Sequence, residues 1–318
     1  MFEVVKETVS NYHTFVSDIT DMVSIMMGEE YNVRIYKVTK NNSLELDSLV
    51  ILKADHNFSP NIYLLSYYEE YLQGTSVKEL AESICRTYKE NLIPRLTENF
   101  SYSYENIKSF IVYRLVSHGR NKKLLEKVPH IKYLDLAITF HCLVRDDEDG
   151  IGTIRITNEH MKLWNISLSN LYELSKENTN RIFYPVIKSM DEVILGILKE
   201  HSTEGNDNRV IERDFEIEIR DDSNDNKMYI LSNRKGINGA ACLLYDNVLM
   251  NFSKQIHSDF YILPSSIHEV ILVPVHKTVS KEALEEMVRD VNRTQVARDE
   301  ILSDHVYIYS RKNNMVSM

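Results

Sequence analysis

Asp259-Phe-Tyr-Ile-Leu-Pro-Ser-Ser-Ile-His-Glu-Val-Ile-Leu-Val-Pro-Val275 consists of two apolar runs on either side of a short polar insert. Apolar runs of this length, rich in Ile, Val and aromatic residues, are typical of strands. The stretch therefore predicts two neighbouring strands joined by a compact connection at 264–269. Polar residues between buried strands can form a functional site, but an ordinary tight connection needs the same pattern.

The composition indicates a globular protein, and the length suggests about two domains. The chain has 318 residues, of which 43% are hydrophobic and 26% charged, with only nine Gly and six Pro. These values allow a buried core and argue against fibrous or low-complexity classes. The 37 Lys and Arg residues against 47 Asp and Glu give a net charge of −10. This charge disfavours nucleic acid and anionic lipid as partners.

The cysteines and the N-terminal stretch predict a cytoplasmic location. Cys85, Cys142 and Cys242 are far apart and odd in number, as expected of reduced thiols rather than of a disulfide framework. Residues 1–28 carry acidic side chains among the apolar ones, so they lack the basic and uninterrupted apolar regions of a signal peptide. No apolar run reaches the roughly 18 to 20 residues that a membrane-spanning helix needs, and we expect no membrane partner.

Hydrophobic spacing predicts helices and strands along the whole chain. Apolar residues recur every three or four positions over 2–27, which predicts an amphipathic helix ended by Gly28. Further predicted elements are a hairpin at 31–37 and 49–53, a strand at 61–65, helices at 67–73 and 76–88, a hairpin at 133–144 and 152–156, and helices at 158–163 and 167–178. The last third is predicted to contain strands at 214–220, 228–231 and 305–309 and helices at 240–256 and 281–291.

This order of elements predicts an α+β, or mixed α/β, fold in which helices cover antiparallel or mixed sheets. Similar runs in the first and middle thirds suggest repeated hairpin-strand-helix-helix units. The polar stretch at 201–209 predicts a boundary between an N-terminal α+β domain, 1–200, and a C-terminal α+β domain, 210–318. The same sequence is also compatible with one continuous globule.

Candidate catalytic residues lie in the polar insert and in one later segment. They are Ser265, Ser266, His268, Glu269, Asp304 and His305. A serine near a histidine suits a nucleophile and its base, but Gly-x-Ser-x-Gly is absent. A zinc-peptidase helix would place a second histidine at position 272, which is Leu. Turn capping by the serines explains the same residues, so both interpretations stay open.

A glycine-rich segment follows the predicted strand at 228–231. In Gly236-Ile-Asn-Gly239, the residues Gly236, Asn238 and Gly239 could offer backbone N–H groups to an anion. The segment matches neither Gly-x-Gly-x-x-Gly nor a P-loop, and an ordinary strand-to-helix turn also uses glycine. Asp222-x-Asn224-x-Asn226 lacks the Gly and Glu of a calcium loop. The sequence predicts no metal site and no cofactor.

Five segments carry a family resemblance. They are Pro129-His-x-x-Tyr-Leu-Asp-Leu136, Thr157-Asn-Glu-His160 with Trp164, Gly236-Ile-Asn-Gly-Ala-Ala-Cys242, Leu263-Pro-Ser-Ser-Ile-His-Glu-Val-Ile271 and Leu302-Ser-Asp-His-Val-Tyr307. With these segments the chain resembles, over nearly its whole length, a bacterial family of unknown function, domain of unknown function 5688. The resemblance implies a bacterial intracellular protein of anaerobic gut lineages, linked to accessory or mobile elements. It implies no reaction, cofactor or binding residue.

Two classes of function are compatible with these observations. The first is a non-enzymatic cytoplasmic binding or regulatory module that presents a surface to an unknown protein or small-molecule partner. Nineteen tyrosines, among them Tyr67, Tyr68 and Tyr71, suit such a surface because each combines apolar area with a polar tip. The second is a hydrolase or transferase that uses Ser, His and Glu side chains at 264–269. The spatial arrangement of the candidate side chains separates the two classes.

Overall fold

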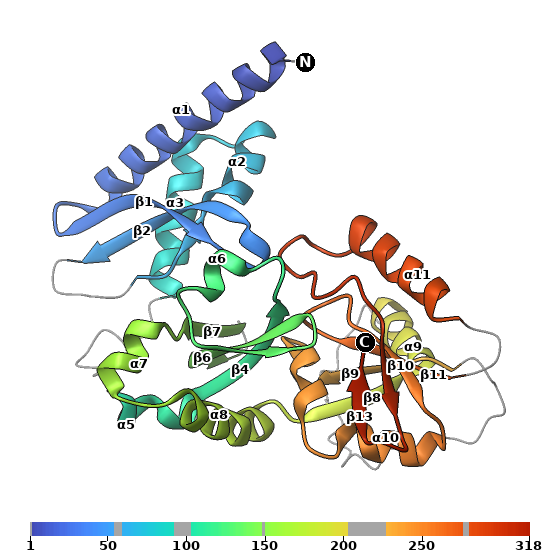
Figure 1. Cartoon of the computed structure of the whole chain (residues 1–318). Coiled ribbons are helices and arrows are strands. Elements are labelled where there is room, and N and C mark those ends of the chain that lie inside the picture. The colour runs from blue at the N-terminus through green and yellow to red at the C-terminus, as the bar shows by residue number, and fades with distance from the viewer. Residues whose placement is uncertain (1, 54–58, 92–102, 148–149, 203–226, 276–279) are drawn as a thin grey trace. The chain divides into compact units, whose positions relative to one another are not determined.

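The structure, a computed structural model, describes residues 2–53, 59–91, 103–147, 150–202, 227–275 and 280–318. Two compact units, Met1–Ser103 and Tyr104–Met318, make up the chain (Figure 1). The fold is α+β, as predicted.

The division between the units differs from the predicted boundary at 201–209, which lies largely outside the described residues. The strands on either side of that stretch are β8 (Pro185–Ser189) and β9 (Tyr229–Asn233), and they pair antiparallel in one sheet.

The first unit is a three-stranded antiparallel sheet packed with helices. Its elements are α1 (Phe2–Met27), β1 (Tyr31–Thr39), η1 (Asn41–Ser43), β2 (Glu45–Lys53), β3 (Ile62–Tyr63), α2 (Leu64–Leu72) and α3 (Val77–Glu90), and the strand order is β1-β2-β3. Alternation along β2 places Leu49 and Ile51 on one face, where they pack with Phe15, Ile19 and Ile84 of the helices. These elements confirm the helix predicted at 2–27, the hairpin predicted at 31–37 and 49–53, and the helices predicted at 67–73 and 76–88.

The second unit begins with a four-stranded antiparallel sheet. Its elements are α5 (Tyr104–Ile107), η2 (Lys108–Phe110), β4 (Ile111–Ser117), α6 (Lys122–Leu125), β5 (His130–Tyr133), β6 (Leu136–Asp147), β7 (Gly150–Arg155), α7 (Asn158–Trp164) and α8 (Leu168–Ile182). Strand β6 pairs with β4, β5 and β7. Helix α8 is fixed to β4 by side chains, since Asn178 Nδ2 donates to Ile111 O and Thr179 Oγ1 accepts the Tyr113 N–H, both at 3.0 Å.

A six-stranded antiparallel sheet completes the second unit, in the order β13-β12-β10-β11-β9-β8. Its further elements are α9 (Met190–Ser202), η3 (Gly239–Leu244), α10 (Val248–Ile256), β10 (Phe260–Leu263), β11 (Val270–Pro274), α11 (Lys281–Thr294), β12 (Tyr307–Ser310) and β13 (Met315–Ser317). Phe260 of β10 meets Phe252 of α10, with ring centroids 5.1 Å apart, whereas Leu263 packs with Leu284 of α11. The two helices therefore cover opposite faces of the sheet.

The predicted hairpin at 259–275 is confirmed, because Leu263 pairs with Ile271 at the inner end of β10 and β11. The predicted helix at 240–256 is instead divided into η3 and α10. Asn247 between them has φ +63°, a left-handed conformation that ends a helix. The predicted strand at 214–220 lies outside the described residues.

Candidate functional site

Two loops of the second unit lie side by side and contain all six candidate catalytic residues. The β10–β11 connection at 264–269 runs antiparallel to the segment 299–306 that precedes β12. Hydrogen bonds of 2.9 Å join Ile267 N to Glu300 O, Leu302 N to Ser265 O and Ser303 N to Pro264 O. An isolated bridge between Ser266 and Ile301 lies among them. This pairing brings together two Ser-x-His tripeptides, 266–268 and 303–305.

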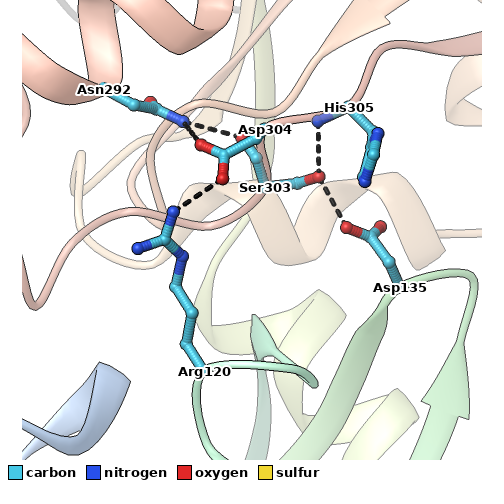
Figure 2. Close-up of polar contacts among 6 residues, drawn as sticks. All are labelled: Arg120, Asp135, Asn292, Ser303, Asp304 and His305. Atoms are coloured by element: carbon cyan, nitrogen blue, oxygen red, sulfur yellow. Dashed lines mark hydrogen bonds and ion pairs between the residues drawn. The ribbon is translucent and has the colours of Figure 1, made fainter.

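Ser303 connects its loop to the turn between β5 and β6 (Figure 2). Its Oγ donates to Asp135 Oδ2 at 2.7 Å and accepts the backbone N–H of His305 at 3.0 Å. The residue is 2% exposed. Both the proton and a lone pair of this hydroxyl are therefore used inside the protein.

Asp135 receives a second hydroxyl, that of Tyr307, on its other carboxylate oxygen. Tyr307 is fully buried, and burial together with the charge and hydrogen bond of Asp135 raises the pKa of its phenol far above the usual value. The residue before Asp135 is Leu134, whose φ of +53° is rare for a bulky side chain. Because Tyr133 pairs with Leu136, the turn has only two residues, and a left-handed residue suits the twist of such a hairpin. The Asp135 contacts hold this strained turn in place.

Asp304 is bound by a cation and an amide. Arg120 Nη2 lies 2.6 Å from Oδ2, and Asn292 Nδ2 donates to Oδ1 at 2.8 Å (Figure 2). Burial raises the pKa of Asp304, but the hydrogen bonds from Asn292 and Arg120 and the Arg120 charge outweigh burial, so the pKa lies below its usual value. Asp304 is therefore ionised at neutral pH and anchors both α11 and the segment after β4.

Asn292 of α11 connects the same loop to its helix. It is 4% exposed, and its Nδ2 also donates to Ser303 O at 2.9 Å. The two acceptors fix the orientation of the amide. Its Oδ1 is buried and has no hydrogen-bond partner among the described residues.

His268 has contacts at both ring nitrogens. Its Nδ1 accepts the backbone N–H of Asn238 at 3.3 Å, so the neutral ring carries its proton on Nε2, which faces Glu300 Oε1 at 3.3 Å. Ser266 Oγ accepts the backbone N–H of His268 at 2.9 Å. The imidazole could accept a serine proton at Nδ1 only by giving up the Asn238 contact.

The glycine-rich segment packs directly against this loop. A Cβ at Gly239 would lie 2.5 Å from His268 O and 2.1 Å from Ser232 Oγ, so only glycine fits there. The backbone N–H groups of Asn238 and Ala240 donate to His268 Nδ1 and Ile267 O. Of the amides expected to cradle an anion, that of Asn238 thus binds the 264–269 loop, as does the neighbouring Ala240 amide, which was not among those expected. Gly236, with φ +65°, closes the turn by donating to Asn233 O.

The remaining candidates have local positions. Ser265 contributes its backbone carbonyl to the ladder, and Glu269 is half-buried directly before β11. His305 is exposed, and its backbone N–H belongs to the Ser303 turn. The structure therefore brings the six residues into one pair of loops, while the side-chain hydrogen bonds of Ser303, Asp304 and His268 run to other parts of the unit.

Sequence reasoning missed four residues of this network. They are Arg120, Asp135, Asn292 and Tyr307. Asp135 and Tyr307 lie in segments that carry the family resemblance, and that was the available signal. Arg120 follows a strand and Asn292 lies inside a helix, where a single polar residue on its own indicates nothing.

Thiol, metal and membrane features are limited in the described part of the chain. All three cysteines are buried, and burial raises the pKa of the Cys242 thiol to about 12. A thiol of this kind is a poor nucleophile at neutral pH. Among the described residues, no group of three or more His, Cys, Asp or Glu is arranged to hold a metal ion. No helix in those ranges is long and apolar enough to cross a membrane.

Comparison with known proteins places this network within a family. The model described as "Family of unknown function (DUF5688)" matches residues 12–311. The chain belongs to the DUF5688 family. The matched range covers nearly all of both units and all six residues drawn in Figure 2. No curated protein and no solved structure matches the chain.

Proposed function

We propose that this DUF5688 protein is a non-enzymatic binding or regulatory module of the bacterial cytoplasm. The main support is the state of two serine hydroxyls. Ser266 and Ser303 are 6% and 2% exposed, and each accepts the backbone N–H of the residue two positions later. A nucleophilic serine needs a base that can take its proton and a substrate that can reach it. Hydroxyls used in this way stabilise turns.

The histidines support the same proposal. His268 already accepts a backbone N–H at Nδ1, and His305 is exposed with its backbone tied to the Ser303 turn. Binding loops held by such a network present a fixed surface to a partner, because each turn is connected to a sheet or helix behind it.

A hydrolase or transferase is the second candidate because of one contact. Asp135 Oδ2 accepts a hydrogen bond from the Ser303 hydroxyl at 2.7 Å, and a carboxylate can act as a general base. Such a reaction would require the loop to open, since the Ser303 hydroxyl is buried. The Ser-His arrangement predicted at 264–269 differs from this pair, because there the Ser266 hydroxyl accepts the backbone N–H of His268.

Thermal unfolding of the purified chain in the presence of metals, nucleotides and metabolites tests the proposal. A compound that binds the folded state raises the unfolding midpoint by mass action. We expect a stabilising compound to be recovered chemically unchanged after incubation, as analysed by mass spectrometry. Recovery of a converted compound would contradict the proposal.

The variant His268→Ala/Glu269→Ala locates the site, with Glu286→Ala on the exposed side of α11 as a matched control. Loss of the midpoint shift in the first variant alone would place the ligand at the β10–β11 connection. If no compound shifts the midpoint, a protein partner is sought by capture with the immobilised chain.

A further inference from the structure

One face of the four-stranded sheet carries an unusual set of polar side chains. Arg114 of β4 pairs with Thr139 of β6, and His141 of β6 pairs with Arg155 of β7. Thr153 pairs with Leu143, which lies two residues beyond His141. Because paired residues and every second residue share a face, these five polar side chains all lie on the same face. We call it the arginine face, defined as Arg114, Thr139, His141, Thr153 and Arg155.

Arg114 reaches across the central strand of this face. Its Nη2 donates to Thr153 Oγ1 on β7 at 3.0 Å. A guanidinium has five N–H donors in a planar fork. Within the described part of the chain, Thr153 is the hydrogen-bond partner of this group, and no carboxylate there lies within ion-pair distance of it.

Arg114 carries a positive charge on the arginine face. Burial, followed by the charge of Arg155, lowers the pKa of Arg114 to about 10, so the guanidinium remains charged at neutral pH. Burial and the two arginines hold the pKa of His141 well below its usual value, so its imidazole is neutral. His141 is 7% exposed and lies 3.3 Å from Thr139 Oγ1. A charge withdrawn from water is costly unless an opposite charge accompanies it.

We propose that the arginine face binds a phosphate group, either as free phosphate or as the monoester of a small metabolite. This inference rests on the proposed binding function and names its ligand class. The Arg114 fork matches two phosphate oxygens, and the half-buried Thr153 hydroxyl beside it supplies a further donor. The net charge of −10 repels long polyanions, so a small ligand suits this local cationic face better than nucleic acid.

Unfolding midpoints of the full chain, measured with sodium phosphate against sodium chloride at equal ionic strength, test the inference. Phosphate also stabilises proteins non-specifically by exclusion from their surface, so the decisive quantity is the part of the shift that depends on Arg114. We expect saturating phosphate to raise the parent midpoint by about 5 °C or more, and the saturable part to vanish in Arg114→Gln. Arg289→Gln, on the exposed side of α11, should keep the full shift.

Thr153→Val keeps the side-chain shape, removes the hydroxyl that orients Arg114, and should reduce the shift. If Arg114→Gln does not fold, this variant decides: a reduced shift supports the site and an unchanged shift overturns it. Equal shifts in the parent, Arg114→Gln and Arg289→Gln, or no saturable shift in the parent, would also overturn it.

A second arm replaces phosphate with glucose 6-phosphate. A larger saturable shift than with phosphate would identify a monoester as the ligand, and a smaller one would identify free phosphate. Release of phosphate from the ester, abolished in Arg114→Gln, would contradict the non-enzymatic proposal while leaving the phosphate site intact. If neither compound shifts the unfolding midpoint and no phosphate is released, the phosphate site is refuted and the non-enzymatic proposal is not.

Discussion

The two Ser-x-His turns of the second unit have the same local structure and different long-range contacts. In both, the serine Oγ accepts the histidine backbone N–H, at 2.9 Å for Ser266 and 3.0 Å for Ser303. In the first turn the His268 ring makes the distant contact, to the Asn238 amide. In the second turn the serine makes it, through Asp135, while His305 is exposed. The tripeptide thus determines the turn, and the surroundings determine which side chain connects it to the rest of the unit.

Gly239→Ala should have the largest effect, because it breaks the packing behind the first turn. Its methyl group would clash with His268 O and Ser232 Oγ, both too close to remain in place. We expect a loss of about 3 kcal/mol in the free energy of unfolding, measured by urea denaturation. Gly119→Ala is the control, since nothing lies within 4 Å of its added Cβ, and it should cost less than about 0.5 kcal/mol. Equal losses in the two variants would contradict this packing.

Ser303→Ala and Ser266→Ala should separate the two turns. Loss of the Ser303 hydroxyl leaves an oxygen of the half-buried Asp135 carboxylate and the His305 amide without this partner, and we expect a cost of about 2–3 kcal/mol. Loss of the Ser266 hydroxyl removes one amide contact and should cost about 1 kcal/mol. Urea denaturation of both variants measures the difference.

Combination with Asp135→Asn provides the control for this pair. Ser303→Ala and Asp135→Asn should be non-additive by about 1 kcal/mol or more, because their side chains touch. Ser266→Ala and Asp135→Asn should be additive within about 0.5 kcal/mol. If Ser266→Ala were non-additive with Asp135→Asn and Ser303→Ala were additive with it, the assigned contact between Ser303 and Asp135 would be wrong.

For the histidines, we expect the larger loss of stability in the first turn, whereas for the serines we expect it in the second. His268→Ala removes the contact with the Asn238 amide and should cost about 1 kcal/mol. His305→Ala changes an exposed side chain and should stay within about 0.5 kcal/mol of the parent. Thermal and urea unfolding compare the two variants, and a larger cost for His305→Ala would refute the comparison.

The middle residue of the second turn, Asp304, makes a contact that acid weakens. The middle residue of the first turn, Ile267, has no ionisable group. The folded-state pKa of Asp304 is lowered, so the stabilisation is present above the usual carboxyl pKa of about 3.9 and is lost as pH falls below it. The side chain is 38% exposed, so the effect should be below about 1 kcal/mol. The stability difference between the parent and Asp304→Asn should shrink from pH 7 to pH 3. An Asp290→Asn control, on an exposed pair, should show a smaller change over the same range.

Local features of the fold were predictable because neighbouring residues determine them. Ser76 and Glu79 form the capping box that begins α3, with Ser76 N donating to the Glu79 carboxylate at 3.1 Å. The hairpin at 259–275 follows from its apolar runs and polar insert. The left-handed Asn247 that divides the 240–256 helix was missed, because an asparagine in an apolar helical pattern does not by itself require that conformation.

The network around the two turns could not be predicted from spacing. Asp135 and Ser303 are 168 residues apart, and Arg120 and Asp304 are 184 residues apart. Their contacts exist because the β5–β6 turn and the segment after β4 meet the loop before β12, a consequence of sheet topology. Asp304 and His305 could be singled out from the sequence, whereas the contacts of Asp304 with Arg120 and Asn292 follow from the arrangement of the strands and helices.

Intact-mass spectrometry with peptide mapping of the folded chain, after treatment with a fluorophosphonate that modifies activated serines, most directly tests whether Ser266 and Ser303 are structural. A known serine hydrolase in the same reaction serves as the positive control. We predict that the chain gains no adduct at Ser265, Ser266 or Ser303 while the control enzyme is fully modified. A stoichiometric adduct at any of these three serines, lost when the chain is unfolded beforehand, would contradict the assignment of a non-enzymatic module.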